Sequence, residues 1–357
     1  MNTTWLTLSK ERRMELLNQA TELTGLPEIA IEKDWWVTLA LKASFELKYS
    51  SSIVFKGGTS LSKGWNLIER FSEDIDLAID RKFFGVDGDI SKSQIKNLRK
   101  KSCEFISTIF LEDLTKQFTE WKAIDECKLN AQPITDSDKD PQVIEIHYNS
   151  VFDKSDYLPQ RVLIEVSSRS LMEPSENREI NSILSTVFPD QAFATEPFSI
   201  STVLPQRTFL EKIFLLHEEF SQDTAKIRID RLSRHLYDLE KLMDTEHGKA
   251  AIKDTELYRG IVTHREKFNP LRGLDYSNHI PSKIKIIPPD TVIKEWETDY
   301  QAMTQNMIYG DPLNFDRLIK RIQELQKLKH GFRQPAFWQY QCCAVVLLVC
   351  RYVSTYE

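Results

Sequence analysis

A glycine turn beside a short predicted strand constrains this chain most. The apolar run 53–55 is typical of a buried strand, and the glycines that follow allow backbone angles denied to other residues. Thr59 or Ser60 can then cap a helix that runs to about Ile68. Because such a turn presents free N–H groups at a helix N-terminus, it is a ready site for phosphate. The predicted nucleotide-binding residues are Gly57, Gly58, Thr59, Ser60 and Lys63.

Two aspartates follow on the next predicted strand, over 75–79. Side chains alternate along a strand, so Asp74 and Asp76 share one face while Ile75 and Leu77 point into the core. Mg²⁺ is usually held by one or two carboxylates together with substrate phosphates. The glycine turn and the aspartates together therefore predict Mg²⁺ as cofactor, a nucleoside triphosphate as donor, and phosphoryl chemistry. Either feature alone would be an ordinary loop or a solvated strand edge.

The combination resembles the nucleotidyltransferase superfamily, whose motif is a Gly-Gly or Gly-Ser turn followed by Asp-x-Asp. More narrowly, Lys56-Gly-Gly-Thr-Ser-Leu-Ser-Lys63 and Arg70-Phe-Ser-Glu-Asp-Ile-Asp-Leu77 resemble the AbiEii/AbiGii-type toxins of abortive-infection toxin–antitoxin pairs. Upstream, the run 31–37 extends the resemblance, although its Trp35 and Trp36 are simply interpreted as core residues. In all, the resemblance covers about 31–332.

A third acidic residue is expected near the aspartates. The runs 143–148 and 161–166 alternate as strands do, and they offer Glu145 and Glu165. We prefer Glu165 because its strand is more continuously apolar, and a buried acid needs a partner such as a metal ion. The alternative partner is Arg169, in a structural ion pair. The superfamily resemblance implies a role for Glu165 as metal ligand or general base.

Two helices after Pro205 carry further candidates. Lys212 lies in an apolar surround, which is costly for a lysine unless an anion reaches it. On a predicted helix over 231–243, Asp238 is expected on an outer face and could form an i,i+4 salt bridge with Arg234. The resemblance implies that Lys212 grips the triphosphate and that Asp238 belongs to the active site. The match at Asp238 is the looser one.

Basic residues offer two possible RNA contacts in a chain of net charge −6 and pI about 5.8. The first is the outer face of the 231–243 helix, with Arg231, Arg234 and Lys241. The second is a helical stretch whose apolar stripe is expected to include Ile109, and whose cations form either a solvated face or the edge of an RNA groove. Those cations are Lys92, Lys96, Arg99, Lys100 and Lys101.

The predicted fold is α+β, with N-terminal helices and a nucleotidyltransferase-like mixed sheet over 1–204 and a mainly helical lobe over 205–357 that closes the nucleotide cleft. Five cysteines without a C-x-x-C pair predict a cytoplasmic protein with neither a structural disulfide nor zinc. The apolar run 342–350 is too short to cross a bilayer, so no membrane partner is expected.

The family resemblance implies transfer of a nucleotide to the 3′ end of tRNA. This reaction would block aminoacylation and translation, arrest growth in phage defence, and require a cognate antitoxin. Two alternatives stay open at this stage. One is a nucleotidyltransferase acting on a small molecule or protein, and the other is a nucleotide-binding interaction protein without turnover.

Overall fold

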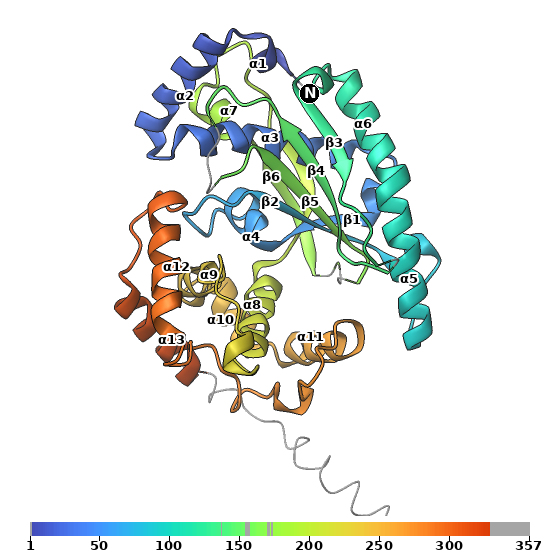
Figure 1. Cartoon of the computed structure of the whole chain (residues 1–357), viewed down its shortest axis with the longest axis vertical. Coiled ribbons are helices and arrows are strands. Elements are labelled where there is room, and N and C mark those ends of the chain that lie inside the picture. Colours follow the sequence, from blue (N-terminus) through green and yellow to red (C-terminus); the bar gives the residue numbers. More distant parts are fainter. Residues whose placement is uncertain (1, 137, 154–157, 170–171, 173, 329–357) are drawn as a thin grey trace, which may run out of the picture.

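A seven-stranded mixed sheet forms the centre of the protein, in the order β3-β4-β5-β2-β1-β7-β6 (Figure 1). The structure, a computed structural model, describes residues 2–136, 138–153, 158–169, 172 and 174–328. The strands are β1 (Ile53–Lys56), β2 (Asp74–Ile79), β3 (Cys127–Ala131), β4 (Gln142–Tyr148), β5 (Arg161–Ser167), β6 (Ser175–Ile180) and β7 (Phe198–Val203). Only the β1–β7 and β2–β5 pairs are parallel.

Helices from the N-terminal part of the chain flank this sheet (Figure 1). They are α1 (Thr4–Thr7), α2 (Lys10–Thr24), α3 (Glu28–Glu46), α5 (Lys92–Phe105), α6 (Leu111–Glu120) and α7 (Ile183–Val187). The central helix α3 contacts both β2 and β5, and its Trp35 and Trp36 are at most 1% exposed. The interpretation of this aromatic pair as core is confirmed.

The two faces of β2 differ in environment. Ile75 and Leu77 are almost fully buried in the main hydrophobic cluster, which also contains residues of α3. Asp74 and Asp76 alternate with them and point the other way, toward a cavity lined by residues of α8 and α9. Strand alternation thus turns the aspartates toward the helices that follow the sheet in sequence.

Those later helices form a second part of the molecule below the sheet (Figure 1). They are α8 (Pro205–Glu219), α9 (Arg234–Met243), α10 (Glu246–Lys253), α11 (Thr255–Phe268), α12 (Ile293–Asn306) and α13 (Phe315–Leu328). Apolar stripes pack them together: Trp296 and Tyr300 of α12, and Leu318 and Ile322 of α13, are at most 2% exposed. The α+β class with a mixed sheet followed by helices is confirmed.

Two local predictions were wrong. The helix after the glycine turn begins earlier, as α4 (Gly57–Thr59), and continues through a π turn only to Gly64. Neither Thr59 nor Ser60 caps it, because the Thr59 hydroxyl donates to the carbonyl of Asp74, and that of Ser60 to the carbonyl of Gly57. Ile109 is 47% exposed, since a π turn over Ile106–Phe110 shifts the stripe onto its end residues.

Among the described residues, no helix combines the length and apolar character needed to cross a membrane. The apolar run 342–350 lies outside them. Two cysteines, Cys103 and Cys127, are described, and both are free thiols.

Candidate active site

Strand register brings three carboxylates together. In the parallel pair β2–β5, Asp76 lies directly beside Glu165, and Asp74, two residues earlier, is on the same face of β2. All three line a cavity of about 380 Å³, together with Gly57, Gly58, Lys212, Arg234 and His235. Glu165 therefore joins the predicted aspartates. Glu145 instead accepts from Gln132 and Arg161, and the alternative partner of Glu165, Arg169, pairs with Asp140.

The glycine turn is required by this cluster. Gly57 has a φ of +79°, and a Cβ at this residue would lie 1.9 Å from Oδ2 of Asp76. A Cβ at Gly58 would lie 2.7 Å from Nη2 of Arg70. Backbone conformation and close approach of the carboxylate thus both exclude a side chain at Gly57.

The cations near the three cavity carboxylates do not offset the effects of burial and neighbouring negative charge. Burial raises the pKa of Asp76, and burial with the neighbouring charge of Glu73 raises that of Asp74. The pKa of Glu165 rises to about 7, because the side chain is desolvated and lies beside Asp76 and Asp74. Carboxylates in this state gain from any cation that reaches them.

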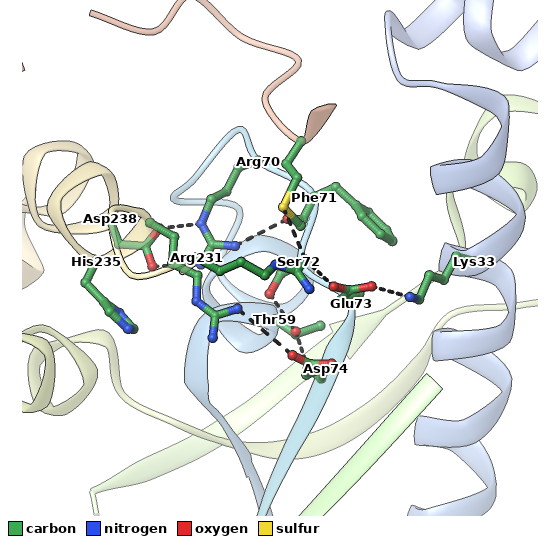
Figure 2. A network of polar contacts seen from close by, with 12 residues as sticks. Lys33, Thr59, Arg70, Phe71, Ser72, Glu73, Asp74, Arg231, His235 and Asp238 are labelled. Carbon is green, nitrogen blue, oxygen red and sulfur yellow. Dashed lines mark hydrogen bonds and ion pairs between the residues drawn. The ribbon is translucent and has the colours of Figure 1, made fainter. Parts of the chain in front are cut away.

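Asp238 is in the opposite state. Its carboxylate accepts from Arg70 Nε (2.7 Å) and Nη2 (2.8 Å) (Figure 2). It also lies 2.8 Å from Lys212 Nζ. Burial alone would raise its pKa, but these two cations outweigh burial and lower it. The prediction of an outer position was wrong: Asp238 is 0% exposed, because α9 turns it toward α8 and the segment before β2.

The anion that Lys212 needs is therefore supplied by the protein. Lys212 Nζ also donates to Nδ1 of His235 (3.4 Å), whose pKa is held well below its usual range by burial and by Lys212. A neutral His235 keeps this acceptor available. Lys212 is thereby held at the wall of the carboxylate cavity, which it lines.

Glu73, like Asp238, is a buried carboxylate that pairs with two cations. It lies between Lys33 of α3 and Arg231, with an ion pair to each (Figure 2). Desolvation opposes ionisation, but the two cations lower the pKa of Glu73. This carboxylate joins the N-terminal helices to the segment before α9.

The three predicted RNA contacts lie beside carboxylates at the start of β2 or in the segment before it. Arg231 pairs with Glu73, Arg234 lies 4.0 Å from Asp74, and Lys241 lies 3.0 Å from Glu69. Arg231 is not on α9 at all, since it precedes the helix with a φ of +58°. The predicted common face of these cations is therefore wrong, and so is the i,i+4 bridge from Arg234 to Asp238.

Three predicted nucleotide-binding side chains do not reach the carboxylate cavity. Lys63 donates to Asp34 and to the carbonyl of Asn181, and lines a separate cavity of about 320 Å³. The hydroxyls of Thr59 and Ser60 are buried within the turn. Of the five residues in and after the glycine turn that were predicted to bind nucleotide, only Gly57 and Gly58 line the carboxylate cavity.

Sequence reasoning missed Arg70 and Lys56. Both stand inside the quoted motifs, and both line the carboxylate cavity. Arg70 is 1% exposed in the structure. Its place inside the motif that contains Asp74 and Asp76 is the sequence signal that could have identified it. Lys56 precedes the glycines and lies 3.6 Å from Glu211.

The donor set fits Mg²⁺ shared with a substrate. Among the described residues, no three His, Cys, Asp or Glu side chains form a metal site of their own. Mg²⁺ takes few protein ligands and completes its octahedron with phosphate oxygens and water. Asp74 and Asp76, on one face and with raised pKa values, match this requirement.

Comparison with known proteins identifies the relatives of this chain. Residues 40–325 match the model of the family described as nucleotidyl transferase AbiEii toxin, type IV toxin–antitoxin system. The structure is similar to MenT4, a nucleotidyltransferase toxin from Mycobacterium tuberculosis H37Rv, with a TM-score of 0.51 and 16% identity over 93% of this chain and 92% of that one. A search of curated proteins found no match.

Proposed function

Because this chain belongs to the AbiEii nucleotidyltransferase toxin family of type IV toxin–antitoxin systems, we propose that it transfers a nucleotide from an NTP to the 3′ end of tRNA. This transfer would block aminoacylation and translation, and so arrest growth during abortive infection as a phage defence. We also propose that it acts in the cytoplasm, where NTPs and tRNA occur together. Family membership implies a cognate antitoxin.

One observation carries the chemistry: Asp74, Asp76 and Glu165 meet in a cavity whose wall includes Lys212. Asp74 and Asp76 would hold Mg²⁺, which supplies charge neutralisation on the triphosphate when bound. Residues Gly57 and Gly58 let the triphosphate approach the backbone closely.

The remaining groups divide the work of phosphoryl transfer. Lys212 stabilises the charge that develops on the leaving pyrophosphate, and Asp238 with Arg70 positions Lys212. Glu165, which lies beside Asp76 in the cavity, accepts the proton of the acceptor hydroxyl. We further propose that 1–204 act as the catalytic lobe and that 205–357 close the nucleotide cleft.

The direct test is incubation of the protein with each labelled NTP, Mg²⁺ and total deacylated tRNA. We expect label on tRNA with the wild type and none with Asp76→Ala. Label on a small molecule or a protein, with tRNA unlabelled, would overturn the acceptor. NTP binding without transfer to any acceptor would overturn the activity.

A further inference from the structure

A second cavity of about 520 Å³ adjoins the carboxylate site. Its wall includes Glu165 and Asp76, as does that of the first cavity, and both also share Lys56 and Arg265. Lys212, by contrast, lines only the first. Glu165 therefore stands between two spaces, one of which contains the lysine assigned to the leaving group.

The wall of this second cavity is rich in cations. Arg99 of α5 and Arg169 after β5 face it, together with Lys56 and Arg265. Each has a counter-charge: Asp138 lies 3.4 Å from Arg99, Asp140 lies 3.4 Å from Arg169, Glu211 lies 3.6 Å from Lys56, and Glu218 pairs with Arg265. The charge of Arg99 lowers the pKa of Arg169, after the larger effect of burial, so the two guanidinium groups repel each other.

Residues that line this cavity also have buried polar atoms without hydrogen-bond partners. Arg99 Nε and Asn269 Oδ1 are buried and make no hydrogen bond within the described residues. Arg169 Nε has only its ion pair with Asp140 there. Buried donors and acceptors without partners are costly, so these residues of the cavity wall are not fully satisfied within the described protein.

Positive charge continues outward along α5. Lys92 and Lys96 precede Arg99 at helical spacing and are exposed, as are Lys100 and Lys101. No carboxylate of the described part of the chain forms an ion pair with any of these lysines, in a protein of net charge −6. Such a strip of cations matches the backbone of a nucleic acid better than it matches a small molecule.

We propose that the acceptor RNA strand enters through this second cavity, with its phosphates on Arg99, Arg169 and the exposed lysines of α5. This inference rests on the proposed function and places the RNA on a surface other than Arg231, Arg234 and Lys241. Arg231 and Lys241 already bind Glu73 and Glu69 of the segment before β2, and Arg234 lies 4.0 Å from Asp74 of β2.

Separate spaces for the entering strand and the leaving group suit in-line displacement. The attacking oxygen must lie opposite the leaving oxygen, and Lys212 lines the carboxylate cavity but not the second cavity. The terminal 3′ oxygen of the RNA forms a bond to the α-phosphorus, the bond to the β-phosphate oxygen breaks, pyrophosphate leaves toward Lys212, and the hydroxyl proton passes to Glu165.

The test is binding of 5′-fluorescent deacylated tRNA over about 50 to 200 mM salt. We expect Lys96→Ala/Arg99→Ala to weaken binding roughly tenfold and to reduce the salt slope by about one to two units. Charge reversal at two exposed positions, Lys96→Glu/Lys100→Glu, should weaken binding further without affecting the melting temperature. NTP affinity, measured separately by calorimetry, should stay unchanged in both variants.

Two charge-removal controls are matched to these variants. Lys320→Ala removes an exposed lysine of α13, and Lys241→Ala removes one of the originally predicted contacts. Both should bind tRNA within about twofold of the wild type. If the wild type labels tRNA but the α5 variants bind it normally, this inference fails while the proposed function stands. If the wild type labels only some other acceptor, both fail.

Discussion

Glu73 and Asp74 are neighbours in sequence, yet they belong to opposite electrostatic regions. Glu73, like Asp238, is surrounded by cations and has a lowered pKa. Asp74, like Asp76 and Glu165, lies in the cavity and has a raised pKa. We call the first set the paired carboxylates (Glu73, Asp238) and the second the cavity carboxylates (Asp74, Asp76, Glu165).

The difference separates two tasks. Glu73 pairs with Lys33 and Arg231, and Asp238 pairs with Arg70 and Lys212. These ion pairs hold the helices after the sheet against the segment before β2. Their charge is already neutralised within the protein. Cavity carboxylates have unmet charge and can therefore bind a cation together with substrate. Removal of a cavity carboxylate should therefore reduce activity, whereas removal of a paired carboxylate should reduce stability.

The largest expected effect is on activity, from Asp76→Ala. Nucleotide transfer should fall at least about 10³-fold, because a proposed metal ligand is lost. The fold should persist with an unchanged or higher melting temperature, since removal of one carboxylate relieves repulsion from its neighbours. Activity is measured by label transfer and stability by thermal unfolding. Wild-type turnover in this variant would remove Asp76 from the site.

Asp238→Asn should instead act on stability. It leaves Arg70 and Lys212 buried beside a neutral group, which should cost about 3–5 kcal/mol of unfolding free energy. Urea unfolding of the variant and of Asp76→Ala side by side gives the comparison. Equal stability of the two variants would contradict the distinction between paired and cavity carboxylates.

Lys212→Ala tests a residue that, like Arg70, contacts the paired carboxylate Asp238 and lines the cavity. We expect kcat/KM to fall about 10²-fold, with a higher NTP requirement and lower turnover together, because its charge acts on the triphosphate before and during transfer. Steady-state kinetics over a range of NTP concentrations measures both. If the kinetics are unaltered and only the melting temperature drops, Lys212 serves only to stabilise the fold through its ion pair with Asp238.

The pH dependence of stability should have opposite signs in the two sets. Glu165 has its pKa raised from 4.5 to about 7, so the folded metal-free protein takes up this proton before the unfolded chain does. Its contribution to stability therefore increases as the pH falls from about 8 to 5. The paired carboxylates have lowered pKa values, so their contribution is lost only as the pH falls below the usual range of a carboxylate.

Glu165→Gln tests the pH dependence of stability that is expected from Glu165. The melting temperature of the metal-free variant should exceed that of the wild type at about pH 8, and the gap should close toward about pH 5. Added Mg²⁺ should stabilise the wild type more than the variant. Parallel pH curves for the two proteins would show that Glu165 is not strained in the folded state.

The smallest effect is expected from Lys241→Ala. Its partner Glu69 is about half exposed, with 55% of its side chain accessible, so the pair should contribute less than about 1 kcal/mol. Urea unfolding measures this value. A loss of unfolding free energy comparable to that of Asp238→Asn would mean that the exposed Lys241–Glu69 pair stabilises the protein as much as the buried pairs do.

Some features were predictable from local sequence because chain stereochemistry sets them. Alternation along a strand places Asp74 and Asp76 on one face whatever the rest of the chain does. The need for glycine at Gly57 follows from its positive φ, and the stripe of Trp296 and Tyr300 follows from the helical period. With these motifs the family and the α+β class could be predicted.

Charge partners were decided only by the tertiary structure. Asp238 lies 168 residues from Arg70 in sequence, and Lys63 lies 29 residues from Asp34. A helical period predicts which side of α9 Asp238 occupies relative to its neighbours, but not which segment packs on that side. A buried carboxylate takes whichever cations the packed segments bring to it, and that assignment needs the whole fold.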